Sequence, residues 1–116
     1  MALPADARMV DAVVVGAGMG GIYALHKFRD QGLDVVGLEG GSGVGGVWFH
    51  NRYPGARVDI ESLHYTYYFS QEIYREWEWK ERFAPQPELL RYLNFCADKL
   101  DIRPLIHFET WMAGAQ

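Results

Sequence analysis

Six consecutive residues, Gly16-Ala17-Gly18-Met19-Gly20-Gly21, have types and a spacing that suit phosphate chemistry, and they follow a run of valines. Gly16 permits a tight turn, Gly18 lets the backbone approach a phosphate group, and Gly21 lets a following helix pack closely. The N–H groups at the start of such a helix attract negative charge. The pattern therefore predicts a pyrophosphate-binding turn. Gly20 is an additional glycine in this turn and is counted with it, without a role of its own.

An acidic residue, Glu39, lies a suitable distance downstream, at the end of a second predicted strand. Its carboxylate would accept hydrogen bonds from the ribose hydroxyls of an adenosine. An acid at this place favours FAD or NAD, because it would repel the 2′-phosphate of NADP. The alternative is a glycine turn in an α/β protein that binds no nucleotide.

A second glycine-rich stretch follows immediately, Gly40-Gly41-Ser42-Gly43-Val44-Gly45-Gly46. NAD needs no second glycine loop after the acid, whereas a loop folded over the pyrophosphate and ribityl chain of FAD needs glycines for close backbone approach. The alternative is a flexible linker, although the aromatic Trp48-Phe49-His50 that comes next is not typical of linkers. The stretch favours FAD.

These motifs require elements that position them. Three valines in residues 11–15 predict a parallel strand buried on both faces, and apolar residues at helical spacing predict a helix that ends near Gly32. Residues 34–39 form the second predicted strand. Together these segments predict a βαβ unit with a right-handed crossover. Residues 40–59 are expected to form a long loop shaped around a ligand.

The remaining sequence is dense in aromatic residues. Alternation in residues 65–69 predicts a short strand. Ile73, Trp77 and residues 79–83 look irregularly helical, with Trp77 and Trp79 filling a core. Residues 87–100 predict a helix with Pro87 at its first position and Cys96 on its apolar side, as a small buried hydrophobe. Residues 105–112 predict a third strand.

The composition disfavours several other classes of function. The 116 residues carry a net charge of −4 and one cysteine, so one small domain without an internal disulfide is expected. The basic residues form no dense cluster, which disfavours nucleic acid as a partner. No membrane segment or targeting signal is recognised, so a cytoplasmic protein is expected. The four histidines share no metal-ligand spacing, and no metal site is predicted.

Residues 45–59 resemble the N-terminal motif of the flavin-dependent Baeyer–Villiger monooxygenases. The fixed positions of that motif are all present here: Gly45, Gly46, Trp48, Tyr53, Pro54, Gly55 and Asp59. The similarity extends over roughly residues 11–110, through Ile60-Glu61-Ser62 and Pro85-Gln86-Pro87-Glu88. Related flavin monooxygenases that oxidise nitrogen and sulfur share the glycine motifs and match residues 53–62 less well.

The resemblance implies an activity and its cofactors. In that family NADPH reduces FAD, O2 adds to form a flavin C4a-peroxide, and a ketone becomes an ester or lactone. The protein positions and protects the reactive group. The implied partners are therefore a small ketone and O2. An amine or sulfide substrate in the related oxygenases is the alternative, and a truncated module that binds nucleotide or partners without catalysis is another.

The resemblance also implies residue roles. The ADP half of FAD would be held by Gly16, Gly18, Gly21 and Glu39, whereas Gly46, Val47 and Trp48 would line the pyrophosphate and ribityl chain. Asp59 and Tyr65 would lie near the isoalloxazine ring, and Arg57 to Asp59 would approach the nicotinamide of NADP. In the family, an acid matching Asp59 pairs with a catalytic arginine. The alternatives are a turn cap at Asp59 and an ordinary core tyrosine at Tyr65.

The expected fold class is α/β, with an incomplete Rossmann-like, three-layer FAD-binding domain made of a parallel sheet and crossover helices. Residues 1–10 are expected to be an N-terminal tail, and residues 11–116 part of the FAD-binding domain. Neither the NADPH-binding motif of the family nor the arginine partner of Asp59 is found, so the chain alone is expected to be inactive. An incomplete sheet leaves an unpaired edge, which makes self-association a hypothesis.

Overall fold

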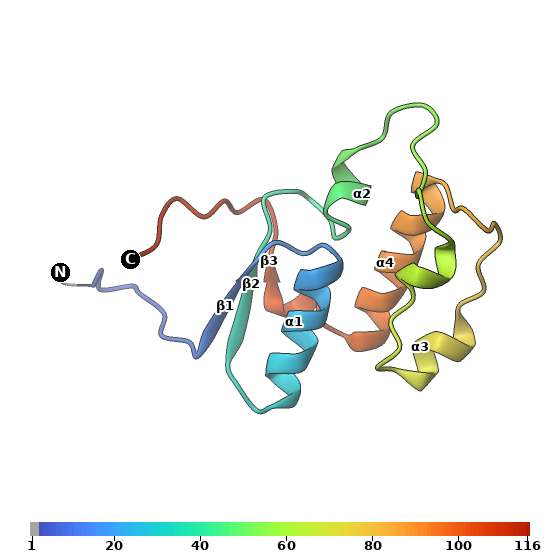
Figure 1. The fold of residues 1–116 in the computed structure, drawn as a ribbon. Coiled ribbons are helices and arrows are strands. Elements are labelled where there is room, and N and C mark those ends of the chain that lie inside the picture. Colours follow the sequence, from blue (N-terminus) through green and yellow to red (C-terminus); the bar gives the residue numbers. More distant parts are fainter. Residues whose placement is uncertain (1–2) are drawn as a thin grey trace.

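The computed structural model describes residues 3–116. Three strands, β1 (Ala12–Val15), β2 (Val35–Leu38) and β3 (Ile106–His107), form a parallel sheet in the order β1-β2-β3. Helix α1 (Met19–Asp30) connects the first two strands and packs against both. Figure 1 shows the helices on one side of this sheet and both chain ends on the other. The predicted βαβ unit and the Rossmann-like α/β class are therefore confirmed.

Helix α1 follows the predicted pattern. Ile22 and Leu25 are fully buried, and they face the sheet as the apolar spacing requires. Gly32 follows the helix in a left-handed conformation (φ +84°), and its N–H donates to the carbonyl of Arg29 at 2.9 Å. The Arg29 guanidinium in turn donates to the carbonyls of Leu100 and Asp101. The end of α1 is thereby tied to the end of the longest helix, α4 (Gln86–Leu100).

Helix α4 (Gln86–Leu100) forms the wall of the core opposite α1. It begins one residue before the predicted start, so Pro87 stands at its second position. Four residues of its predicted apolar stripe are buried as expected, whereas the other two, Leu90 and Leu100, are half-buried. The buried residues of this face are Leu89, Leu93, Cys96 and Ala97, together with Tyr92. Burial raises the pKa of the Cys96 thiol to about 12, which keeps this group protonated and unreactive. The prediction that Cys96 is a buried hydrophobe is confirmed.

One face of the sheet carries no covering layer among residues 3–116. Val13 is 53% exposed and Val15 56%, so the prediction that β1 is buried on both faces is wrong. The reason is that α1 packs on the face of Ala12 and Val14, where the core cluster lies, and α4 packs in turn against α1. The described chain thus contains two of the three layers of the expected fold, namely the sheet and one layer of helices.

The aromatic segment differs from its predicted structure. Residues 65–69 form no strand; Ser62–Tyr65 is a 3-10 helix, η1, and the chain then runs to α3 (Gln71–Glu76). The alternating tyrosines serve packing instead, since the ring of Tyr65 lies against Trp48 and the ring of Tyr67 lies against Tyr92, at centroid distances of 5.9 and 6.2 Å. The Ser70 hydroxyl caps α3 by accepting the N–H of Ile73.

Two further segments also depart from prediction. The predicted irregular helix is right at Ile73, which lies in α3, and wrong at residues 77–83, which are not helical. The prediction that Trp77 and Trp79 fill a core is confirmed, since both rings lie against the ring of Tyr92, at centroid distances of 5.2 and 4.7 Å. The third strand is only two residues long. It follows a short 3-10 helix, η2 (Arg103–Leu105), and soon afterwards Glu109 adopts a left-handed conformation (φ +52°) that an extended strand does not contain.

Candidate dinucleotide-binding site

The first glycine turn connects β1 to α1. Two of its residues must be glycine, one because of its backbone conformation and the other because a side chain would clash. Gly16 adopts φ +97°, which is accessible to glycine and strained for other residues. A Cβ on Gly21 would lie 2.0 Å from the carbonyl oxygen of Gly16, closer than any real contact. The start of α1 can therefore approach the end of β1 only because both residues lack side chains. The free N–H groups of the first helical turn lie at this point.

The second glycine stretch lies directly against the first. A Cβ on Gly18 would be 3.3 Å from the Cα of Gly46, and a Cβ on Gly46 would be 2.9 Å from the Cα of Gly18. The N–H of Gly45 donates to the carbonyl of Ala17 at 2.9 Å. Two loops far apart in the sequence are thus in backbone contact. Added methyl groups on Gly16 or Gly20 would meet open space, so this side of the turn is accessible.

Glu39 lies beside this pair of loops. Its side chain is 5% exposed, and its two oxygens accept the backbone N–H groups of Ala17 at 2.8 Å and Gly41 at 2.6 Å. The imidazole Nε2 of His50 lies 3.8 Å from the Glu39 carboxylate. A carboxylate accepts about four hydrogen bonds, so both oxygens retain capacity for ribose hydroxyls. Glu39 links the two glycine loops to each other through their backbones.

A short helix, α2 (Val47–His50), lies within the predicted loop and begins directly after Gly46. Val47 is 62% exposed, whereas Trp48 is half-buried and packs edge-on against Tyr65 at a centroid distance of 5.9 Å. The Gln86 side-chain amide donates to the carbonyl of Trp48 at 2.5 Å. A hollow of about 160 Å³ opens beside Val47 and Trp48. Val47 and Trp48, which are predicted to line the ribityl chain, therefore both border this hollow.

The segment that carries Asp59 is held by an antiparallel pairing that we call the 56–62/81–86 ribbon. Its backbone hydrogen bonds run from Gln86 N–H to Ala56 O, from Val58 N–H to Ala84 O, and from Ser62 N–H to Arg82 O. The hydroxyl of Ser62, which is 2% exposed, also accepts the N–H of Ala84 and faces the carbonyls of Glu81 and Arg82. This ribbon fixes the backbone on both sides of Asp59.

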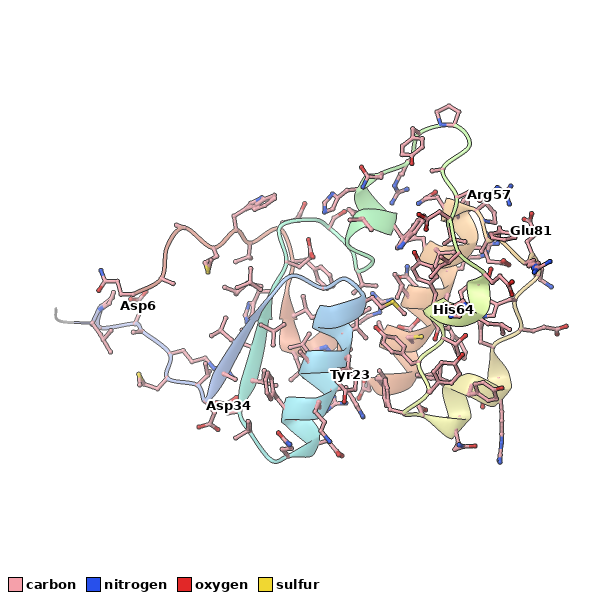
Figure 2. The ribbon with its side chains drawn as sticks, in the orientation of Figure 1. Asp6, Tyr23, Asp34, Arg57, His64 and Glu81 are labelled. Atoms are coloured by element: carbon pink, nitrogen blue, oxygen red, sulfur yellow. The ribbon has the colours of Figure 1, made fainter. Side chains whose placement is uncertain are left out.

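Charged side chains along the ribbon are paired. The Arg57 guanidinium lies 2.9 Å from the Glu81 carboxylate and donates to the carbonyl of Phe83 at 2.7 Å; Figure 2 shows Arg57 and Glu81 together at this end of the molecule. The Arg82 guanidinium, 2.7 Å from the Glu61 carboxylate, holds the pKa of that carboxyl below its usual value. Asp59 is exposed, and within residues 3–116 its side chain takes part in no recorded hydrogen bond or ion pair. The turn-cap alternative for Asp59 therefore gains no support.

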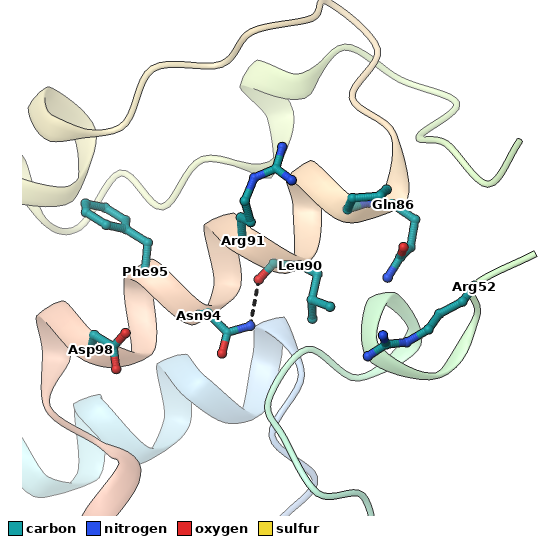
Figure 3. A pocket seen from close by; sticks show the side chains of 8 residues that line it. Arg52, Gln86, Leu90, Arg91, Asn94, Phe95 and Asp98 are labelled. Carbon is teal, nitrogen blue, oxygen red and sulfur yellow. Dashed lines mark hydrogen bonds between the residues drawn. The ribbon is translucent and has the colours of Figure 1, made fainter.

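A separate groove of about 710 Å³ lies between α2 and α4. Figure 3 shows Arg52 on one side and Arg91 and Leu90 on the other. None of the residues predicted to bind cofactor lines this groove. Gln86 lies at its rim and holds α2 to α4 through the bond to Trp48. The groove therefore lies outside the predicted site, although Gln86 at its rim helps to hold Trp48 in place.

Two residues near the site were not predicted. His50, the last residue of α2, approaches Glu39, and only its position two residues after Trp48 could have suggested this. The Trp111 indole covers Gly40, the residue after Glu39. In the described part of the chain, no group of three or more potential ligands is arranged for a metal ion, and no helix is long and apolar enough to cross a membrane.

A strand, a glycine turn that excludes side chains, a helix and an acid after the second strand define the class of Rossmann-like dinucleotide-binding proteins. Residues 14–77, more than half of the chain, match the family described as NAD(P)-binding Rossmann-like domain. The chain belongs to this family.

Curated relatives are oxygenases. The chain is 53% identical over 106 residues to a Baeyer–Villiger monooxygenase of Pseudooceanicola batsensis, an alignment that covers 90% of this chain and 19% of the relative. It is 48% identical over 106 residues to acetone monooxygenase (methyl acetate-forming) of a Gordonia species, covering 91% and 20%. A phenazine N-monooxygenase of Lysobacter antibioticus is 43% identical over 111 residues, covering 95% and 20%. The chain thus spans about a fifth of the length of these relatives.

Solved structures agree with these relatives. An FAD-bound form of OTEMO superimposes with a TM-score of 0.88 at 47% identity, covering 95% of this chain and 20% of that chain. An oxidised steroid monooxygenase bound to NADP superimposes with a TM-score of 0.84 at 57% identity, covering 86% and 19%. The resemblance to flavin monooxygenases is therefore confirmed at the level of both sequence and fold.

Proposed function

We propose that this chain is the FAD-binding segment of a Baeyer–Villiger-type monooxygenase, with residues 1–10 as a tail and residues 11–116 as part of the FAD domain. One observation carries the proposal: the backbones of Gly18 and Gly46 meet at a distance that leaves no room for a Cβ on Gly46. A single glycine turn suits any dinucleotide. Two glycine loops in contact, with open space above the first, suit a pyrophosphate enclosed from two sides.

The other predicted residues fit this arrangement. The turn formed by Gly16, Gly18, Gly20 and Gly21 presents the N–H groups at the start of α1 to the pyrophosphate, whereas the N–H of Gly16 itself stays bonded to the carbonyl of Leu38. The retained lone pairs of Glu39 accept the ribose hydroxyls. Gly46, Val47 and Trp48 follow the ribityl chain. Trp48 and Tyr65 pack together at the flavin end, on the side to which the ribbon brings Arg57 and Asp59.

Bound flavin supplies the redox chemistry, with NADPH and O2 as co-substrates and a ketone as the substrate that becomes an ester or lactone. The chain's own task is to bind and orient that group. In the proposal Asp59 holds negative charge beside the flavin ring and orients an arginine supplied by another part of the protein. For binding NADP, Arg57 would leave its ion pair with Glu81, which is exposed and easily exchanged.

FAD binding tests the proposal directly. Titration of the purified chain with FAD, followed by flavin fluorescence and by equilibrium dialysis, is expected to show saturable one-to-one binding. Gly46→Ala is expected to abolish it, because the new Cβ would meet Gly18. Gly114→Ala, in open space far along the C-terminal segment, is the matched control. A folded chain without saturable FAD binding would overturn the proposal. The same chain is expected to show no ketone-dependent NADPH consumption.

Nitrogen oxidation is a second candidate for the whole enzyme. The observation that favours it is the 43% identity to a phenazine N-monooxygenase over nearly the full chain. The FAD-binding segment would act in the same way in either reaction. Oxidation of amines or N-heterocycles by the full-length protein, with no turnover of ketones, would select this candidate.

A non-catalytic module that associates with itself is a third candidate. Val13 and Val15 leave an apolar face of the sheet exposed, and β1 is an edge strand. Sedimentation of the purified chain measures this directly. A concentration-dependent dimer that Val13→Thr weakens would support the module, whereas a monomer at all concentrations would exclude self-association.

A further inference from the structure

Trp111 occupies a defined place at the carboxyl end of the sheet. The N–H of Thr110 donates to the carbonyl of Glu39 at 2.9 Å, and the N–H of Glu109 donates to the carbonyl of Gly41 at 2.9 Å. These two bonds fix the backbone just before Trp111 to the residues on both sides of Gly40. The tryptophan is therefore held beside the acid that is proposed to bind ribose.

The indole ring lies flat on Gly40. A Cβ on this glycine would be 2.5 to 2.7 Å from three different ring atoms, and such similar distances place it over the face of the ring. Any side chain at residue 40 would displace the indole. The absence of a side chain at residue 40 thus leaves the space that the Trp111 ring occupies.

The opposite side of the ring is open. Trp111 is 78% exposed, the highest value among the exposed large hydrophobic residues of the described chain, and it belongs to neither core cluster. The core therefore does not explain a large aromatic ring whose backbone is fixed on Glu39 and Gly41. An exposed aromatic face is a platform for another flat ring.

We propose that Trp111 stacks on the adenine ring of the dinucleotide whose ribose Glu39 binds, an assignment that rests on the proposed function. Adenine is bonded directly to that ribose, so a ribose held at Glu39 places the base within a few atoms of residue 40. Ligands of parallel α/β sheets bind beyond the carboxyl ends of the strands, and Trp111 follows β3 at that edge. Stacking of this kind changes affinity by about tenfold per base.

The test separates recognition of the base from recognition of phosphate. Calorimetric titration of the protein with ADP and, separately, with inorganic pyrophosphate is carried out for wild type, Trp111→Ala and Trp111→Phe. Trp111→Ala is expected to weaken ADP about tenfold and leave pyrophosphate unchanged, whereas Trp111→Phe keeps most of the ADP affinity. Tyr74→Ala, which removes an exposed aromatic ring from α3, is the control.

A second variant reaches the same ring without changing it. Gly40→Ala is expected to displace the indole from residue 40 and to reproduce the selective loss of ADP affinity. Unchanged ADP affinity in Trp111→Ala, or equal weakening of ADP and pyrophosphate, would overturn the assignment of Trp111 while leaving FAD binding intact. A wild-type protein that binds neither ADP nor pyrophosphate would overturn the proposed function and this inference together.

Discussion

Replacing Glu39 by glutamine tests whether one carboxylate holds the two glycine loops together. Its oxygens accept N–H groups from Ala17 at 2.8 Å and from Gly41 at 2.6 Å, in a site that is 5% exposed. Glutamine presents one oxygen and one NH2, so one buried N–H would face another donor. Loss of one hydrogen bond to a charged acceptor costs about 1.5–3 kcal/mol. With a urea m-value of about 1–3 kcal/mol per molar, the midpoint of unfolding should fall by about 1 M.

Urea titration followed by far-UV circular dichroism measures this shift. Glu78→Gln is the matched control, because it makes the same chemical change at an exposed residue where no such bonds exist. An equal midpoint for Glu39→Gln and wild type would refute the reasoning, since the buried N–H groups would then be satisfied without the carboxylate. A changed m-value would indicate an altered unfolded or native state in place of a lost bond.

Three other changes have definite expected outcomes. Gly21→Ala should prevent stable folding because its Cβ would lie 2.0 Å from the Gly16 oxygen, whereas Gly20→Ala, with open space, should keep the fold; thermal melting distinguishes them. Ser62→Ala leaves the buried N–H of Ala84 without its acceptor and should lower the free energy of unfolding by about 1–3 kcal/mol, against no change for the exposed Ser42→Ala. Burial raises the pKa of Cys96, Tyr67 and Tyr92 above their values in the unfolded chain. Their contribution to the free energy of unfolding is therefore complete below the unfolded pKa values and falls above about pH 9. Denaturant titrations at rising pH check this, and constant stability up to about pH 11 would contradict it.

The parts of the fold that the sequence predicts are those decided by local periodicity. Helix α1 ends at Asp30, just before Gly32 as expected, and the apolar stripe of α4 is buried at Leu89, Leu93, Cys96 and Ala97. Both are long enough for the helical period to be unambiguous. Alternation in residues 65–69 was misleading because Tyr65 packs on Trp48 of α2, whereas Tyr67 hydrogen-bonds to Met19 of α1 and Tyr92 of α4, and neither tyrosine pairs with a strand. The length of β3 depends on its pairing with β2, which no local pattern contains.

The candidate site divides in the same way. Glycine spacing predicts the first turn, because steric exclusion by Gly21 acts over a few residues. Three other contacts join segments that are distant in the sequence. They are Gly18 with Gly46, His50 with Glu39, and Trp111 with Gly40. Such contacts follow from how the loops cross at the edge of the sheet. The roles of Asp59 and Tyr65 toward flavin and of Arg57 toward NADP stay predictions.

The open face of the sheet has a consequence for how such a protein is made. In a product of the relatives' length, roughly four-fifths of translation would follow the synthesis of these residues. At about 5–20 residues per second, the ribosome would need on the order of tens of seconds to finish. If later residues cover Val13 and Val15, the nascent domain would present this apolar strip throughout that interval. Chaperone capture at β1 would then set the yield of folded enzyme, independently of the stability of the finished fold.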